Sequence, residues 1–131
     1  MRSAAAHLVC RAGERLALSM LLALVSLHSG ARAADLQRGA QLFNTCASCH
    51  SVLGDGLGPD LTGVFGQHAA SGSAFAYSDA LRNSGLVWNE ATLRAFLRNP
   101  QRLVPGTKMT FPGYQNAADI DDVIAYLETL R

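Results

Sequence analysis

Apolar residues recur along this chain at helical spacing in four places, and one further apolar block is continuous. The continuous block occupies residues 16–27. The periodic stretches predict helices over 35–45, 78–83, 89–98 and 116–127. Gly85 is expected to close the second helix and Pro100 to end the third. Because no stretch alternates long enough to indicate a strand, the pattern predicts an all-α fold of three to five short helices joined by long loops.

The first 33 residues have the pattern of an export leader. Three arginines lie within the first 15 residues, ahead of an apolar block that is too short to span a bilayer comfortably. Ala31 and Ala33 then stand in the A-x-A relation that precedes a cleavage point. We therefore expect residues 1–33 to be a cleaved Sec-type signal peptide and residues 34–131 to be a single periplasmic domain. A core helix, a retained anchor and a mitochondrial transit peptide are the alternatives for the leader.

The leader also carries much of the positive charge of the chain. It holds four of the eleven basic residues and one of the ten acidic residues, so residues 34–131 keep seven bases and nine acids. A net charge near −2 argues against a nucleic acid or an anionic membrane as partner, because both require a basic face. A domain of 98 residues also has a hydrophobic core of marginal stability unless a covalent or metal cross-link or an embedded cofactor adds to it.

The segment CASCH, residues 46–50, brings two thiols and an imidazole together. Its spacing is the attachment signature of c-type haem, in which both cysteines form thioether bonds and the histidine reaches an axial position of the iron. Structural zinc needs four ligands, and His68 is the only further cysteine or histidine of residues 34–131. A thioredoxin-like dithiol normally accompanies a βαβ pattern, which this chain lacks. The segment therefore predicts one covalent haem c, with zinc and a redox dithiol as the alternatives.

The second axial ligand decides what such a haem does. Met109 is the only methionine of residues 34–131, and it lies in PGTKMTFPG, where proline and glycine favour a stiff loop. A thioether ligand raises the potential and closes the iron to exogenous ligands. A lone methionine is more often core filler, and His68 would instead give a bis-histidine haem of low potential. We expect Met109 to be the ligand.

Five further stretches follow CASCH in a characteristic order. They are GPDLTGVFG at 58–66, AFAYSDA at 74–80, WNEATLRAFLRNP at 88–100, PGTKM at 105–109 and DVIAYL at 122–127. Together with CASCH they resemble class I cytochrome c of the mitochondrial type and its soluble bacterial counterparts, over almost all of residues 34–131. The resemblance implies the cytochrome c fold, wrapped around one covalently attached haem.

The resemblance also assigns roles to individual residues. The residues are Cys46 and Cys49 (thioether bonds), His50 and Met109 (axial ligands), Pro59 (carbonyl acceptor for the other ring N–H of His50), Tyr77 and Trp88 (donors to a haem propionate) and Thr107 (beside the methionine loop). Packing alone is the alternative role for Tyr77, Trp88 and Thr107. Gly39 would let the first and last helices approach closely, because a side chain there would force them apart.

Several positions depart from the family pattern. The loop between His50 and Pro59 is shorter, Gln67 stands where an arginine commonly faces a propionate, Leu81 replaces a usual polar residue, and Phe96 replaces a tyrosine that bonds the methionine sulfur. These changes remove hydrogen-bond donors to the methionine ligand and the propionates. Because such hydrogen bonds set the reduction potential, the family's potential cannot be carried over to this chain. The basic residues left for docking are Arg102 and Lys108 near Met109, with Arg94 and Arg98 on the preceding helix.

These observations favour a soluble one-electron carrier that docks transiently on acidic surfaces of redox protein partners and makes no substrate bond. One alternative is a haem subunit of a periplasmic dehydrogenase, because the reduced surface charge suits a lasting interface. Another is a ligand-binding or peroxidase-like haem protein in which the Met109 bond opens. We expect a monomer or an enzyme-associated subunit without a stable membrane anchor.

Overall fold

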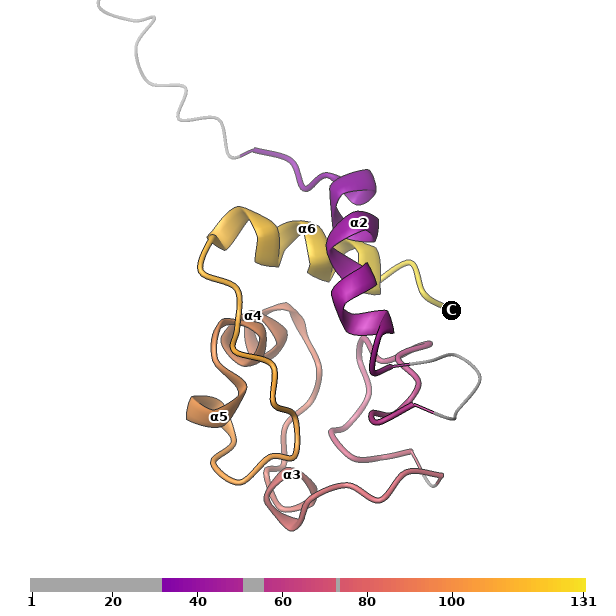
Figure 1. Ribbon diagram of the computed structural model, residues 1–131, viewed down its shortest axis with the longest axis vertical. Coiled ribbons are helices and arrows are strands. Elements are labelled where there is room, and N and C mark those ends of the chain that lie inside the picture. Colours follow the sequence, from indigo (N-terminus) through magenta and orange to yellow (C-terminus); the bar gives the residue numbers. More distant parts are fainter. Residues whose placement is uncertain (1–31, 51–55, 73) are drawn as a thin grey trace, which may run out of the picture. The chain divides into compact units, whose positions relative to one another are not determined.

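The described residues fold into five short helices joined by long loops, as the computed structural model shows (Figure 1). It describes residues 32–50, 56–72 and 74–131. The helices are α2 (Leu36–Ala47), α3 (Asp79–Arg82), α4 (Glu90–Arg98), α5 (Pro100–Leu103) and α6 (Ala117–Leu127). Within these ranges the only strand-like pairing is an isolated bridge between His68 and Val87. The predicted all-α class is confirmed, and the five helices of the described residues lie within the predicted range of three to five.

Each helix begins where a polar side chain caps it. The capping residues are Asp35, Ser78, Asn89, Asn99 and Asn116, and each accepts a hydrogen bond from a backbone N–H of the first turn. Such a bond satisfies one of the four N–H groups that a helix start leaves without a partner. At α4 the cap is reciprocal, because the Thr92 hydroxyl accepts from the Asn89 N–H in return.

The prediction that Pro100 simply ends a helix was incomplete. Pro100 ends α4 but also occupies the first turn of α5, which the sequence analysis missed. Proline suits that position because its fixed backbone angle is already helical and its missing N–H would have no partner there. Asn99 is both the C-cap of α4 and the N-cap of α5, so the two helices follow one another without a linker.

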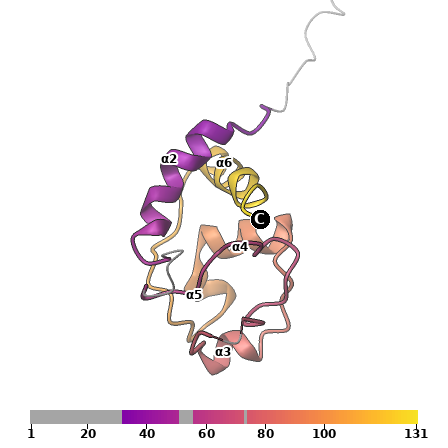
Figure 2. The same ribbon diagram turned by 90° about the vertical axis from the view of Figure 1, so that its right-hand side faces the viewer.

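The first and last helices cross in direct contact, as the two views in Figures 1 and 2 agree. A Cβ added at Gly39 would overlap the backbone carbonyl of Asp122, which confirms the close approach predicted there. The Phe43 and Tyr126 rings pack beside this point, with centroids 5.1 Å apart. Asp122 is fully buried and accepts the Asp35 N–H at 2.7 Å, which ties the start of α2 to α6.

The hydrophobic core lies between α4, α6 and the segments beside them. Its fully or nearly buried members are Trp88, Leu93, Phe96, Leu97, Val104, Ile120, Val123, Ile124 and Leu127. The compact unit that contains this core spans Ala33–Arg131. Within the described part of the chain, no helix has the length and apolar character needed to cross a membrane. The predicted signal peptide, apart from Arg32 and Ala33, and residues 51–55 of the loop after His50 lie outside the described residues.

Candidate haem site

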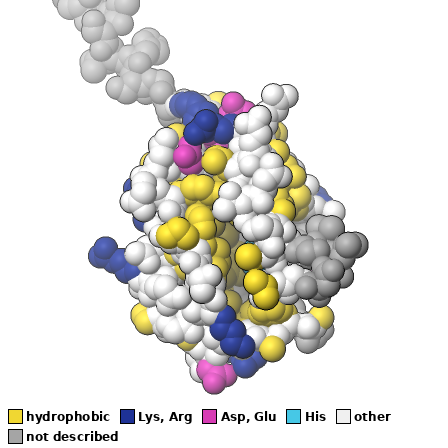
Figure 3. Space-filling view, viewed as in Figure 1, with side chains coloured by type: hydrophobic (Ala, Val, Ile, Leu, Met, Phe, Trp, Pro, Cys, Tyr) yellow, Lys and Arg dark blue, Asp and Glu magenta, His cyan; other side chains and the backbone are white. Residues whose placement is uncertain are grey.

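A cavity of about 700 Å³ opens between the end of α2, the loops that follow it, the core face of α4 and the loop that carries Met109. Hydrophobic side chains surround the hollow on the face seen in Figure 3. A space of this size and character suits a cofactor rather than a bare ion. Four predicted ligand or attachment residues line it: Cys46, Cys49, His50 and Met109.

The helix end presents the two thiols and the imidazole on one turn. Cys46 lies in the last turn of α2, and its carbonyl accepts from the Cys49 N–H at 3.0 Å and the His50 N–H at 2.8 Å. Both cysteines are free thiols and partly buried. This turn explains the spacing of the motif, because both sulfurs and the imidazole border one cavity without a long loop between them.

A backbone acceptor fixes the His50 ring. Nδ1 lies 2.6 Å from the Pro59 carbonyl oxygen, so Nδ1 carries the proton and donates. The neutral ring then has its lone pair on Nε2, the nitrogen that a metal would bind. Gly58 packs on the ring so closely that an added Cβ would lie 2.6 Å from Cε1. A carbonyl on one edge and a glycine on one face together set the ring's direction.

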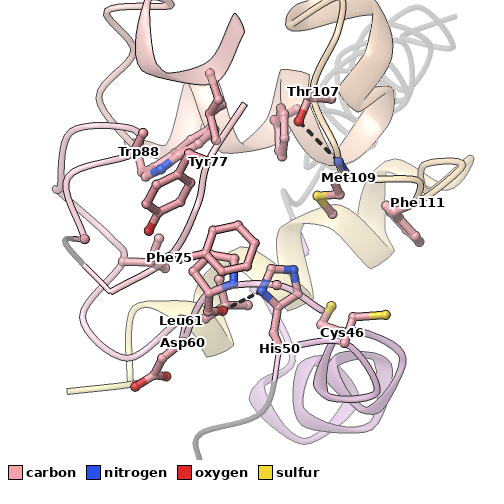
Figure 4. Close-up of a pocket in the computed structure, with 18 of the residues that line it drawn as sticks. Cys46, His50, Asp60, Leu61, Phe75, Tyr77, Trp88, Thr107, Met109 and Phe111 are labelled. Carbon is pink, nitrogen blue, oxygen red and sulfur yellow. Dashed lines mark hydrogen bonds between the residues drawn. The ribbon is translucent and has the colours of Figure 1, made fainter. Parts of the chain in front are cut away.

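Met109 points into the cavity from the other side. Figure 4 shows its sulfur and the His50 ring facing one another, with Cys46 beside the histidine. The Met109 N–H donates to the Thr107 hydroxyl at 3.4 Å, and Thr107 is buried. The Gln101 amide of α5 donates to the Thr107 and Met109 carbonyls at 2.9 and 3.1 Å. The structure thus brings together the two residues that the sequence predicts as axial ligands.

Trp88 and Tyr77 form part of the wall away from the cysteines (Figure 4). Trp88 is only 7% exposed and packs on Phe96 with ring centroids 4.9 Å apart. Neither the Trp88 indole N–H nor the Tyr77 hydroxyl donates a hydrogen bond within the described residues. Both groups are therefore available to acceptor atoms in the cavity, and their predicted role toward a propionate stays a prediction.

The zinc alternative finds no support in the arrangement. Among residues 32–50, 56–72 and 74–131, no group of three or more His, Cys, Asp or Glu side chains is placed to hold a metal ion. His68 borders the cavity, but its backbone pairs with Val87 and its side chain is exposed. The donor set that remains is one imidazole opposite one thioether.

Tyr114 is a neighbour of the attachment turn that sequence reasoning missed. Its hydroxyl donates to the Leu42 carbonyl of α2 at 3.1 Å. Burial, with the nearby Cys46 as a smaller cause, raises the pKa of Tyr114 to about 12. Burial likewise raises the pKa of the Cys46 thiol. The phenol therefore stays neutral at physiological pH and links the Met109 side of the cavity to the helix that carries the cysteines.

The four predicted docking cations differ in their surroundings. Arg94 pairs with Glu90 at 2.8 Å and with Asp121, so two carboxylates already balance its charge. Arg98 donates to the Gln115 carbonyl at 2.5 Å, and the exposed Lys108 donates to the Ala76 carbonyl at 2.7 Å. Of the four, only Lys108 lines the cavity. The side chain of Arg102 makes no hydrogen bond or ion pair with another described residue.

Comparison with known proteins agrees with this site. The family model for cytochrome c matches residues 36–131. The chain belongs to the cytochrome c family. A cytochrome c2 of Rhodoblastus acidophilus is 47% identical over 102 residues, which cover 76% of this chain and 95% of that protein. A cytochrome c of Gibberella zeae is 45% identical over 98 residues, covering 72% and 92%.

A solved structure extends the similarity to the fold. Cytochrome cH from Methylobacterium extorquens superposes with a TM-score of 0.71 at 45% identity, over 73% of this chain and 99% of that one. As a cytochrome c, the chain carries one covalently attached haem c. The residues present fit it, because two free thiols, an imidazole with its Nε2 lone pair available and a facing thioether border a largely apolar cavity.

Two further residues of the site had no sequence pattern that singled them out. Gly58 lies within the GPDLTGVFG stretch, but only the structure shows that it packs on His50. Gln101 belongs to none of the stretches that carry the family resemblance, yet its amide donates to two carbonyls of the methionine loop. Each acts through a contact between segments that no local period encodes.

Proposed function

We propose that residues 34–131 act in the periplasm as a one-electron carrier in which His50 and Met109 bind the haem iron from opposite sides. The observation that carries this proposal is the placement of these two side chains across the cavity, with Cys46 beside the histidine (Figure 4). The haem supplies an iron that is oxidised and reduced by one electron. Because both side chains would hold the iron, the metal would offer no position to a substrate, and we propose electron transfer without a substrate reaction.

The residues around the haem have separate tasks in this proposal. The Pro59 carbonyl accepts the His50 Nδ1–H and keeps Nε2 directed at the iron. The buried wall around Trp88 excludes water, which limits the solvent rearrangement that accompanies a change of charge. Thr107 and Tyr77 offer polar groups beside this wall.

An optical and ligand-binding experiment tests the assignment. The purified protein should show low-spin c-type bands, a weak far-red absorption of ferric iron bound to methionine, and no rapid carbon monoxide binding in the ferrous form. Met109→Ala should abolish the far-red band and allow carbon monoxide to bind. Gln115→Ala, an exposed residue that follows the same loop and does not line the cavity, is the control and should match the wild type. Rapid carbon monoxide binding by the wild type would favour a ligand-binding or peroxidase-like protein.

We further propose that partners dock on the cavity side through Lys108 and Arg102, with Arg98 and Arg94 contributing less. The support is local charge, because Lys108 borders the cavity while two carboxylates balance Arg94. An acidic partner surface would complement this edge.

Small charged oxidants can test the docking edge at low salt. Lys108→Gln should slow oxidation of the ferrous protein by ferricyanide and speed oxidation by a cationic cobalt complex. Arg94→Gln is the internal control and should change either rate less. Neutralising Arg94, Arg98, Arg102 and Lys108 together should slow exchange with an acidic redox protein, and an unchanged rate would refute the docking proposal.

A further inference from the structure

The methionine loop is tied to the preceding helix by one side chain. Gln101 lies in α5, and its Nε2 donates to the carbonyl oxygens of Thr107 and Met109 at 2.9 and 3.1 Å. Both partners are acceptors only, so the amide nitrogen and not the amide oxygen faces the loop. The two bonds reach the backbone on either side of Lys108. They thus span the residue that immediately precedes Met109.

Among the described residues, the other hydrogen bonds of residues 107–109 lie within the turn or join it to another loop, as the Lys108 ammonium does by donating to the Ala76 carbonyl at 2.7 Å. The Thr107 N–H donates to the Val104 carbonyl at 3.0 Å, and the Thr107 hydroxyl accepts the Met109 N–H at a long 3.4 Å. These bonds shape the turn but do not connect it to a helix. Gly106, with φ of +91°, gives the turn a conformation that side chains rarely adopt. The tie from Gln101 is therefore the direct link between this turn and a helix.

The helix that carries Gln101 is itself firmly placed. Asn99 caps it, and the Pro100 side chain is fully buried. Val104, directly after the helix, is only 3% exposed. Because α5 follows α4 without a linker, the core sets the backbone position of Gln101, whose exposed side chain then reaches over to the loop.

We propose that Gln101 is a positioning residue that keeps the Met109 sulfur directed into the cavity. This inference rests on the proposed function, in which Met109 is an axial ligand. Without the two bonds the loop samples conformations in which the thioether points away, and the iron is then open to other ligands. An added ligand binds only this open population, so its apparent affinity reports how often the loop opens.

Imidazole binding to the ferric holoprotein measures that population. Gln101→Glu keeps the shape of the side chain but places acceptors against two carbonyls, and Gln101→Leu removes the donors without adding charge. Each should bind imidazole about tenfold more tightly than the wild type and lose the far-red band at lower imidazole concentration. Hydrogen exchange of residues 104–110 should accelerate by a similar factor while α6 is unaffected.

Two further variants separate positioning from general stability. Gln101→Arg restores N–H donors that reach backbone carbonyls, as Arg98 does at Gln115, and should return the imidazole affinity to within about threefold of the wild type. Gln41→Glu makes the same charge change at an exposed position of α2 and should leave the affinity unchanged.

Several outcomes overturn the proposal. Wild-type imidazole affinity in both Gln101→Glu and Gln101→Leu, or a lower thermal midpoint with an unchanged affinity, would reduce Gln101 to a structural role. Equal effects in Gln41→Glu would show that charge alone is responsible. A wild-type protein without a far-red band would refute Met109 ligation first, and this proposal would fall with it.

Discussion

The crossing of α2 and α6 and the wall that carries Met109 are built in opposite ways. At the crossing, two regular helices touch at Gly39, and protein atoms fill the contact completely. At the cavity, loops rich in glycine and proline surround about 700 Å³, and single hydrogen bonds aim the functional side chains. The first region can be stable by packing alone. The second needs the cofactor as part of its core. Mutations at the crossing should therefore change mainly the stability, and mutations at the cavity should change mainly the properties of the haem.

Removing the cofactor should have the largest effect and should separate the two regions. Changing Cys46 and Cys49 together to alanine prevents thioether attachment, and burial of several hundred Å² of porphyrin, worth on the order of 10 kcal/mol, is lost. We expect no cooperative unfolding transition. Hydrogen exchange should be fast throughout 56–72 and 104–114, with residual protection only in α2 and α6. A haem-free chain that unfolds cooperatively would show that the cavity region does not need the cofactor as part of its core.

Gly39→Ala should destabilise the crossing by about 3 kcal/mol, because overpacking a close contact costs more than the helix propensity of alanine returns. The added Cβ meets the Asp122 carbonyl carbon at 2.8 Å, and the two helices must separate. The guanidinium unfolding midpoint measures this loss, and the far-red band of the folded variant should remain. Asn44→Ala, on the exposed face of the same helix, is the control and should be neutral or slightly stabilising.

Gly58→Ala should destabilise the fold less than Gly39→Ala does. Unlike Gly39→Ala, it should change the spectrum and the midpoint potential of the haem. Its Cβ would press on the His50 ring, and a cost of about 2 kcal/mol is typical for such overpacking. The displaced ring weakens its bond to the Pro59 carbonyl, so the Soret band and the midpoint potential should shift. Leu36→Ala alters a side chain that is 50% exposed and does not line the cavity, and it should change neither.

Asp60 should give the smallest effect, through pH. The Thr62 backbone N–H and hydroxyl lower the pKa of Asp60 below its usual value. The carboxylate thus stabilises the folded state above the unfolded pKa of about 4, and this contribution disappears as the pH falls through the folded pKa. Asp60 is exposed, so Asp60→Asn should cost a few tenths of a kcal/mol at pH 7. Urea unfolding should show this difference shrinking as the pH falls through the lowered folded pKa of Asp60.

The same contrast explains what the sequence could predict. Helix α6 and its packing partner α2 have apolar residues at helical spacing and polar caps, so their existence followed from local pattern. The role of Gly39 followed from the resemblance to the cytochrome c family. The attachment residues followed from the short CASCH spacing. Helix α5 did not, because Pro100 stops one helix and starts another, and the proline alone does not distinguish the two.

The contacts that aim the side chains were beyond local pattern for a physical reason. Gln101 reaches a loop six to eight residues away, and Arg94 pairs with Asp121 from another helix, so neither contact has a period along the chain. Arg94 appeared in the sequence as a free docking cation, and only the fold shows the carboxylates that balance it. Side-chain direction between segments depends on tertiary packing, which a single sequence does not display.

The Gly39 contact also limits how this protein can evolve. Glycine is already the smallest residue, so every substitution at position 39 adds atoms where the Asp122 carbonyl and the Tyr126 Cβ already lie. A descendant could change this residue only by separating two helices, at a large cost in stability. The helix crossing is therefore expected to drift far more slowly than the loops around the cavity.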